Sequence, residues 1–236
     1  MPIAPDVLLP GDPGRAMAMA QALLVSPKMH NLHRGLWGYT GETPKELGGQ
    51  PLSTQSTGMG APSAAIVIHE LAELGARRAI RVGTCGALDP ALELGDLVRV
   101  ESAVGDTGVN RALDGEQAVD GGVVTPDAVL TGRLQEAGAG KPVRVATTDT
   151  FYEGTGDSRE RWVAAGAGAV DMETAALFAL GPGLGVAVAC LLVVSDVFDG
   201  GVRRRIDEGR LEHCVGAMGR AAASALRDEQ VTSKGG

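Results

Sequence analysis

The sequence predicts an α/β protein that folds as a single domain. Short runs of valine, leucine, isoleucine and alanine alternate with longer segments of helical pattern, and glycine and proline clusters separate the two. This alternation is typical of strands joined by helices. The chain has 236 residues, enough to bury one large core, and shows neither an internal repeat nor a linker. We expect residues 1–236 to form one domain, with a frayed tail over residues 228–236.

The composition disfavours several kinds of partner. The formal net charge is −8 and the pI is about 5.0, which argues against nucleic-acid polymers and anionic membranes. The longest uncharged apolar run, residues 184–194, is too short to cross a bilayer, and no export signal is present. Three cysteines without CxxC spacing are expected to be free thiols and indicate no metal site. We therefore expect a cytoplasmic protein that acts on small molecules.

The first strand is predicted over residues 7–9, followed by a glycine-rich turn over residues 10–14 and a helix to about residue 24. Such a turn at a helix N-terminus forms an anion site, because backbone N–H groups and the helix dipole point at the ligand. Arg15 lies in the first helical turn, where the dipole disfavours a cation unless an anion binds there. An ordinary surface arginine is the alternative.

A buried strand over residues 79–82 carries Arg81 and is expected to end at Gly83. Three elements precede it, namely strands over residues 36–41 and 51–57 and a helix over residues 62–74. An arginine is seldom buried without an anionic partner. At the carboxyl end of a central strand, a bound anion such as phosphate would fill that role, with the Thr84 hydroxyl as a second donor. The alternative is an edge strand whose arginine pairs with a glutamate of the preceding helix.

Phe151 and Tyr152 follow a strand predicted over residues 142–146. Two elements come before that strand, namely a surface loop over residues 105–122 and a helix over residues 125–138. Only 3% of the chain is aromatic, so this pair is a candidate stacking surface for a flat ligand. Local core packing is the alternative.

Asp171 and Glu173 follow a short predicted strand and precede a helix over residues 174–180. A helix N-terminus favours carboxylates electrostatically, which accounts for the pair without any function. The alternative is a pair of acids that bind hydroxyl groups or move protons.

An apolar strand over residues 186–194 ends in Ser195 and Asp196. An acid at the carboxyl end of a central strand is a candidate for a functional site. Three arginines at residues 203–205 follow, and then a helix over residues 206–226. Cations thus gather early in the chain, and carboxylates and aromatic residues late. A pocket built from both would bind phosphate at one end and a polyol carrying a flat ring at the other.

Seven motifs occur in order along the chain, namely Leu9–Arg15, His33–Gly41, Gly58–Ser63, Arg81–Gly86, Asp149–Tyr152, Met172–Glu173 and Val194–Asp196. Together they resemble the nucleoside phosphorylase family, which includes hexameric purine nucleoside phosphorylases and uridine phosphorylases. The resemblance covers nearly the whole chain. It implies a three-layer α/β/α fold around a central mixed, twisted sheet.

The resemblance also implies roles for individual residues. The phosphate-binding positions are Gly11, Arg15, Arg34, Arg81 and Thr84, of which Arg34 reaches the phosphate of a neighbouring subunit. The nucleoside-binding positions are Met59, Phe151, Asp171, Met172, Glu173 and Ser195, although the family commonly has glutamate at the Asp171 position. Asp196 is expected to protonate or hydrogen-bond the leaving base, with help from Arg210 or from one of the arginines at residues 203–205.

The activity implied is reversible phosphorolysis of purine nucleosides to free base and ribose or deoxyribose 1-phosphate. Inorganic phosphate is the co-substrate, and neither a metal nor an organic cofactor is expected. A shared Arg34 implies a homo-oligomer built from dimers, up to a hexamer. The preference between 6-oxo and 6-amino purines stays open.

Several alternatives stay open as well. A uridine phosphorylase would carry glutamine and arginine soon after the aromatic pair, where this chain has Thr155 and Asp157, so purines are favoured. A hydrolytic nucleosidase would not need three converging arginines, and a silent nucleoside-binding protein would be expected to lose Asp196 or Glu173. Only ten residues precede the first glycine of the phosphate motif, so the upstream segment from which the family commonly contributes a histidine to the neighbour's ribose 5′ end is absent from this sequence. Either the start is placed late, or 5′ recognition is looser or uses another residue, such as His30.

Overall fold

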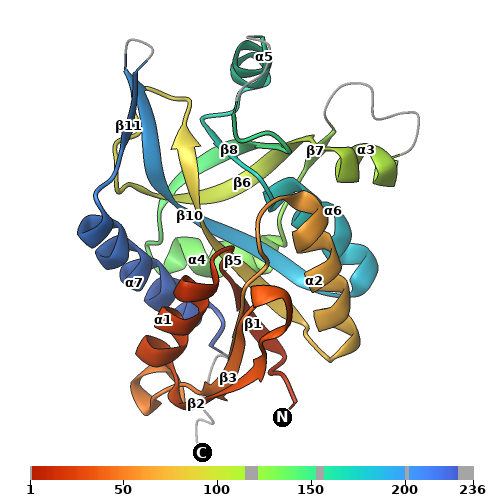
Figure 1. Ribbon diagram of the computed structural model, residues 1–236, viewed down its shortest axis with the longest axis vertical. Coiled ribbons are helices and arrows are strands. Elements are labelled where there is room, and N and C mark those ends of the chain that lie inside the picture. The colour runs from red at the N-terminus through yellow and green to blue at the C-terminus, as the bar shows by residue number, and fades with distance from the viewer. Residues whose placement is uncertain (1, 115–121, 153–156, 200–201, 228–236) are drawn as a thin grey trace, which may run out of the picture.

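The computed structural model describes residues 2–114, 122–152, 157–199 and 202–227. Over these residues the chain is a mixed α/β protein in which seven α-helices pack around an eleven-stranded sheet (Figure 1). The predicted α/β class is therefore confirmed. The predicted frayed tail at residues 228–236 and Thr155 lie outside the described residues. No helix in these ranges is both long enough and apolar enough to cross a bilayer.

The strands, in chain order, are β1 (Asp6–Leu9), β2 (Val25–Asn31), β3 (Gly38–Glu42), β4 (Pro51–Gln55), β5 (Arg78–Ala87), β6 (Leu97–Asp106), β7 (Val123–Val124), β8 (Lys141–Thr148), β9 (Ala169–Asp171), β10 (Ala187–Asp199) and β11 (Val202–Arg205). The helices are α1 (Pro13–Leu23), α2 (Ala61–Glu73), α3 (Gly108–Asp114), α4 (Ala128–Glu136), α5 (Ser158–Ala164), α6 (Thr174–Leu184) and α7 (Glu208–Ala225).

Five of the strands close into a ring through their pairings. β10 pairs in parallel with β5 and antiparallel with β6, β6 pairs with β8, β8 with β9, and β9 returns to β5. The sheet extends from β5 through β1, β4, β3 and β2, and from β10 through β11. The mixed sheet is confirmed by these parallel and antiparallel pairs. Ring closure joins residues as distant as Arg78 and Ala187, which a local sequence pattern does not reveal.

β10 forms the longest apolar run because helices cover both of its faces. Leu191 and Val193 pack in one apolar cluster with residues of α1, α4 and α7. Cys190, Leu192 and Val194 pack in another cluster with residues of α2 and α6. Figure 1 shows these two sets of helices on opposite sides of the strand. A strand buried on both faces has a continuous apolar sequence in place of an alternating one.

β5 is longer than the sequence predicts. The predicted end at Gly83 is wrong, since the strand continues through Gly83 and Gly86 to Ala87. Both glycines pair with β10, opposite Leu192 and Asp196. Pairing with a neighbouring strand therefore keeps these residues extended in spite of the weak strand preference of glycine.

The elements missing from the sequence prediction include β2, β11 and α3. All four residues of β11 are exposed, and β2 is mostly exposed, so neither strand has the apolar alternation that identifies a half-buried strand. The surface loop predicted over residues 105–122 contains α3, which is described to Asp114. Its glycine and aspartate content concealed a helix that packs against α6.

Leu191→Ala tests the two-sided burial of β10. Leu191 has no exposed surface, so its truncation is expected to lower the free energy of unfolding by roughly 2–5 kcal/mol. The control Val129→Ala removes a side chain on α4 that is 68% exposed and is expected to change stability by less than about 0.5 kcal/mol. Urea unfolding followed by circular dichroism measures both, and equal effects would contradict the assignment of β10 to the core.

Candidate active site

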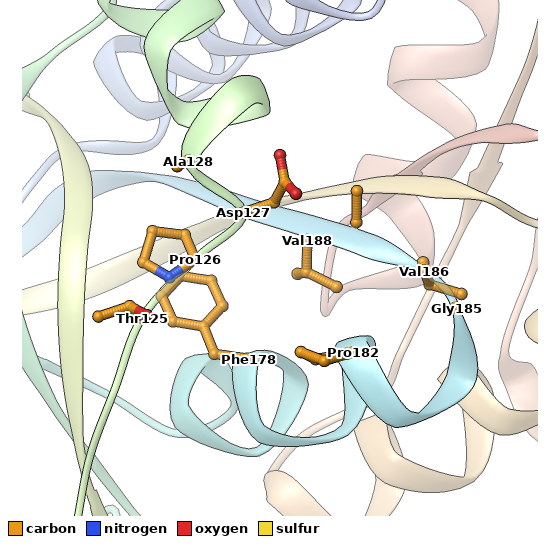
Figure 2. Close-up of a pocket in the computed structure, with 10 residues that line it drawn as sticks. Thr125, Pro126, Asp127, Ala128, Phe178, Pro182, Gly185, Val186 and Val188 are labelled. Carbon is orange, nitrogen blue, oxygen red and sulfur yellow. The ribbon is translucent and has the colours of Figure 1, made fainter.

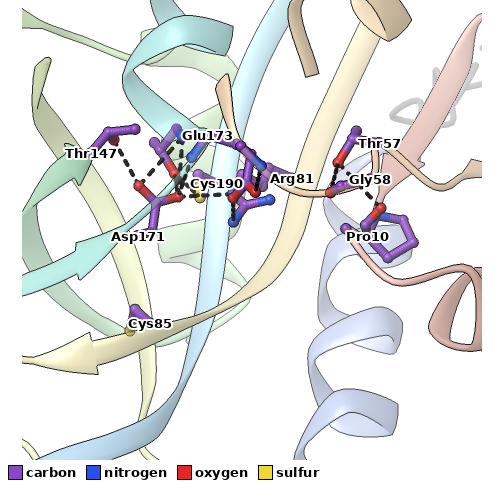
Figure 3. A network of polar contacts seen from close by, with 12 residues as sticks. Pro10, Thr57, Gly58, Arg81, Cys85, Thr147, Asp171, Glu173 and Cys190 are labelled. Carbon is purple, nitrogen blue, oxygen red and sulfur yellow. Dashed lines mark hydrogen bonds and ion pairs between the residues drawn. The ribbon is translucent and has the colours of Figure 1, made fainter. Parts of the chain in front are cut away.

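Arg81 is a buried cation at the centre of the molecule. Its side chain is 4% exposed on β5; its Nε donates to Asp171 Oδ2 at 3.0 Å and its Nη2 to Glu173 Oε2 at 2.5 Å (Figure 3). Burial by itself lowers the pKa of Arg81, but the charges of Glu173 and Asp171 outweigh it and raise the pKa. The alternative of an edge strand paired with a glutamate of the preceding helix is wrong, because β5 has a neighbour on each side.

Asp171 fixes the position of the Arg81 guanidinium through a set of buried hydrogen bonds. Its Oδ1 accepts a hydrogen bond from the Thr147 hydroxyl at 2.7 Å. Its Oδ2 accepts from the Thr174 backbone N–H at 3.0 Å and from the Thr174 hydroxyl at 2.5 Å, in addition to Arg81. Both oxygens are therefore engaged, and the side chain has no exposed surface. The structure thus places Asp171 as a positioning group for Arg81 and not at a ligand surface, where the resemblance led us to expect it.

Glu173 joins the end of β9 to the beginning of α2. Its Oε1 accepts from the Gly60 backbone N–H at 2.6 Å, while its other oxygen binds Arg81. Burial raises the pKa of Glu173, and the charge of Asp171 adds to this against the opposing charge of Arg81. Met59, immediately before Gly60, is 87% exposed. The predicted sugar-binding positions Met59 and Glu173 therefore lie next to each other.

Arg15 lies near Arg81 although the two belong to different elements. Asp12 caps α1 by accepting from the Arg15 backbone N–H at 2.7 Å, which fixes the first helical turn. Burial lowers the pKa of the Arg15 guanidinium, and the positive charges of Arg81 and Arg205 lower it further, against the opposing charges of Asp12 and Glu173. Arg81 and Arg205 thus both lie within electrostatic reach of Arg15.

Two nitrogens of this cation group are buried without a partner. Among the described residues, Arg15 Nη1 and Arg81 Nη1 have no hydrogen-bond acceptor. A buried donor left unpaired costs about 1–3 kcal/mol, so two such donors on neighbouring cations fit an anion with several acceptor oxygens. Gly83 makes room for this arrangement, because a Cβ there would lie 2.8 Å from Arg81 Nη2. Thr84 follows Gly83 and is only partly buried.

The turn that contains Gly11 packs against the segment before α2. The Ser56 hydroxyl donates to the Gly11 carbonyl at 2.7 Å, and a Cβ at Gly11 would lie 3.1 Å from the Gly58 carbonyl oxygen. Figure 3 draws this side of the network, with Pro10, Thr57 and Gly58 to one side of Arg81. The turn before α1 therefore packs against the glycine segment that reaches Glu173.

Asp196 is a buried acid on β10 at the far end of the site. The Ser195 hydroxyl donates to Asp196 Oδ2 at 2.6 Å and lies 3.3 Å from the Cys85 carbonyl. Arg203 Nε donates to Asp196 Oδ1 at 2.9 Å. Antiparallel pairing sets Arg205 opposite Asp196, and Arg203, two residues away, shares that face of the hairpin.

Arg210 does not reach Asp196 in the structure. It lies on α7, and its guanidinium covers Gly95 in the turn before β6, where a Cβ would lie 2.9 Å from Arg210 Nε. Burial raises the pKa of Asp96, but hydrogen bonds from the Glu93 backbone and from Lys141 outweigh it and lower the pKa, and the charge of Arg210 adds a smaller lowering. Of the arginines considered as helpers of Asp196, the structure brings Arg203 into contact, because β11 folds back along β10.

Phe151 extends the same end of the site. Its ring centroid lies 4.6 Å from the guanidinium carbon of Arg203, and Tyr152 meets it edge-on at 5.0 Å. Phe151 is 53% exposed, so core packing does not account for it. The segment after β8 and the hairpin of β10 and β11 are thus joined next to Asp196, because Arg203 contacts both Phe151 and Asp196.

Arg34 stands apart from the other arginines. It is exposed, lies in the 3-10 turn His33–Gly35 and has a left-handed backbone with φ of 56°. That conformation is uncommon for a residue other than glycine. The structure does not bring Arg34 to Arg15 or Arg81 within the same chain.

A sequence profile of the phosphorylase superfamily matches residues 5–227. The chain belongs to this superfamily. Its relatives include DeoD-type purine nucleoside phosphorylases from Caldanaerobacter subterraneus, 38% identical over 204 residues, and Alkaliphilus metalliredigens, 39% identical over 200 residues; each alignment covers 82% of this chain and 83% of the relative. The corresponding protein of Geobacillus kaustophilus is 38% identical over 200 residues, covering 82% of this chain and 81% of the relative. The family identified from the sequence motifs is therefore confirmed.

A cavity beside β10 lies away from this superfamily's motifs. A cavity of about 400 Å³ opens at the start of the strand, lined by residues 125–128 and 185–188 with Phe178 and Pro182 (Figure 2). Asp196 lies roughly 26 Å further along the same strand, at 3.3 Å per residue. The cavity is therefore separate from the candidate site. Over the described ranges, no group of histidine, cysteine and acidic side chains is arranged to hold a metal ion.

His30, a candidate for contact with the sugar, is engaged inside the chain. Its Nε2 lies 3.1 Å from Gln55 Oε1 and its Nδ1 lies 3.0 Å from the Thr40 hydroxyl. The Gln55 amide nitrogen donates to two backbone carbonyls, which leaves Oε1 as the acceptor and assigns the ring proton to Nε2. Burial lowers the pKa of His30. Both ring nitrogens therefore have partners in the sheet.

The His30 network predicts a pH-dependent stability. Because the folded-state pKa is lowered, the unfolded chain binds more protons below about pH 6.5, and stability is lost as the pH falls through that region. In urea unfolding at pH 7.5, 6.5 and 5.5, the stability advantage of the wild type over His30→Gln is expected to shrink as the pH falls. His213→Gln, a change to an exposed residue of α7, is the control for loss of a histidine. An advantage that grows towards pH 5.5 would contradict the assignment.

Proposed function

We propose that this protein is a purine nucleoside phosphorylase, a pentosyltransferase. It converts purine ribonucleosides or deoxyribonucleosides and inorganic phosphate reversibly into free base and pentose 1-phosphate. The observation that carries the proposal is the pair of neighbouring cations, Arg15 and Arg81, whose buried Nη1 atoms lack partners within the described structure, beside Glu173. Superfamily membership and the names of the relatives support the same activity.

In this proposal, phosphate binds to residues from the N-terminal part of the chain. Arg15, Arg81, Thr84 and the turn at Gly11 hold its oxygens, and Arg34 of a neighbouring subunit completes the site. The two cations, Arg15 and Arg81, orient the dianion and lower the barrier by positioning it below the sugar before the reaction starts. Asp171 keeps Arg81 in place, which restricts the direction from which phosphate approaches.

The nucleoside lies between Glu173 and Asp196. Glu173 accepts hydrogen bonds from the ribose hydroxyls, Met59 and Met172 pack against the sugar, and Phe151 and Ser195 lie at the base. A phosphate oxygen bonds to C1′ as the bond from C1′ to the purine nitrogen breaks. The electron pair of the breaking bond moves into the base. Asp196 donates or shares a proton at the purine N7. The proton that HPO₄²⁻ loses on becoming an ester balances the one that the base gains.

The proposal extends to the whole chain. We place residues 1–236 in a single three-layer α/β/α domain, because separate apolar clusters lie on the two faces of β10. The exposed Arg34, with its left-handed backbone, supports a homo-oligomer in which subunits share sites. The reaction needs no metal or organic cofactor, since phosphate is the nucleophile. Three free cysteines, two of them buried, fit a cytoplasmic setting.

Product analysis tests the proposed reaction. Inosine, guanosine, adenosine and uridine are each incubated with the protein, with and without phosphate, and the products are separated by chromatography. We expect a purine base together with ribose 1-phosphate, only when phosphate is present. The ratio of the inosine and adenosine rates then gives the preference at the 6-position. Free ribose released without phosphate would indicate a hydrolase, and cleavage of uridine alone would contradict the purine assignment.

Arg15→Ala tests the phosphate end separately. Arg81 is unsuitable because its removal would leave two buried carboxylates without a cation, whereas Arg15 is only partly buried. Loss of charge-assisted hydrogen bonds to phosphate is expected to raise the phosphate KM by roughly 10- to 100-fold, with a smaller effect on the nucleoside KM. Arg220→Ala, which removes an exposed arginine of α7, is the control. Unchanged phosphate saturation in Arg15→Ala would remove Arg15 from the site.

A further inference from the structure

Arg203 lies between two groups that the proposed function assigns to the purine base. Its Nε donates to Asp196 Oδ1 at 2.9 Å, and its guanidinium carbon lies 4.6 Å from the ring centroid of Phe151. The Arg203 side chain is 35% exposed, whereas that of Asp196 is 8% exposed. One planar cation therefore covers an aromatic face and, at the same time, occupies one oxygen of a buried acid.

A purine needs the same two contacts. It is flat and stacks on aromatic rings, and its N7 is the atom that Asp196 is proposed to meet. The Arg203 guanidinium is also flat, stacks on the ring of Phe151 and presents an N–H to the carboxylate. A base that meets both Asp196 Oδ1 and this face of Phe151 overlaps the guanidinium. The two cannot occupy that position together.

We propose that Arg203 is an internal occupant of the base subsite, which the purine must displace in order to bind. The inference rests on the proposed function and deepens it. In the free protein, the guanidinium imitates the base by its shape and by its hydrogen bond to Asp196. When the base enters, it takes over both contacts, and Asp196 Oδ1 faces the purine in place of the arginine.

A second stacked pair shows how Arg203 can leave while the hairpin stays docked. Arg159 of α5 lies 4.6 Å from the ring centroid of Phe198, on β10. The hairpin of β10 and β11 thus supplies one arginine and one phenylalanine, and the segment around α5 supplies the reciprocal residues. Only the pair containing Arg203 also touches Asp196. Exchange of that pair for a purine leaves the Arg159 contact intact.

Base binding to Arg203→Ala tests the inference. Hypoxanthine and adenine are titrated by calorimetry into the wild type and the variant, without phosphate. The stacked, partly exposed Arg203 cation and its ion pair with the buried Asp196 no longer compete with the ligand, so we expect the variant to bind its preferred base roughly 3- to 30-fold more tightly. The nucleoside KM is expected to fall by a similar factor. Arg220→Ala, the change on α7, is the control for loss of an arginine.

Arg203→Lys separates charge from shape. Lysine keeps the positive charge but lacks the flat guanidinium, so we expect an affinity between those of the wild type and Arg203→Ala. Thermal unfolding checks that both variants fold. Equal or weaker base binding by Arg203→Ala would overturn the inference while leaving the phosphorylase proposal in place. A wild type that neither binds purine bases nor releases them from nucleosides would remove the proposed function, and the inference with it.

Discussion

The burial of Arg81 constrains the rest of the site. Its guanidinium is compensated by two carboxylates that lie about ninety residues further along the chain, Asp171 and Glu173. Removing either one would leave an unbalanced charge in the interior, so the cation and both acids form one unit. The unit requires β5, β9 and the beginning of α6 to assemble together. Among the described residues, one nitrogen of the Arg81 guanidinium, Nη1, is then left buried without a hydrogen-bond partner.

The two ends of the site differ in how firmly they are built. At the proposed phosphate end, Arg81, Asp171 and Glu173 are buried and bound on several sides, so their geometry exists before any ligand arrives. At the base end, Phe151 is half exposed and Arg203 comes from an edge strand. In the proposed reaction, the rigid group around Arg81 would orient the phosphate, and the more exposed end would admit a base that has to enter and leave.

Local patterns in the sequence predicted much of this arrangement. The strand and glycine turn before Arg15, the buried strand with Arg81, and the apolar strand that ends at Asp196 all appear in the structure, because each depends on neighbouring residues alone. The motifs also identified the superfamily correctly. The partners of Arg81 were not predicted as such, because Asp171 and Glu173 meet it only after the ring of strands has closed.

The arginine that contacts Asp196, Arg203, could not be chosen from local sequence patterns either. Family position suggested Arg210 first, and the three consecutive arginines were the only local sign of a competitor. Choosing between them requires knowing that residues 202–205 pair with β10, and a strand of four exposed residues has no apolar pattern to reveal it. Thr147 and Thr174, which hold Asp171, gave no sequence signal, since a hydroxyl group becomes informative only when its acceptor is known.

The ring of five strands separates a part of the sheet whose strand pairing is fixed from a hairpin whose sequence and length can change. A closed ring has no free edge, so β5 and β10 cannot slip past each other without breaking pairings all around it. Beyond Asp196, however, β10 leaves the ring and pairs with β11 alone. Under the proposed function, insertions or substitutions in that hairpin would reshape the base end for a different heterocycle while the group around Arg81 keeps its geometry. Such an enzyme would keep the same reaction with phosphate while the base that leaves is exchanged for another.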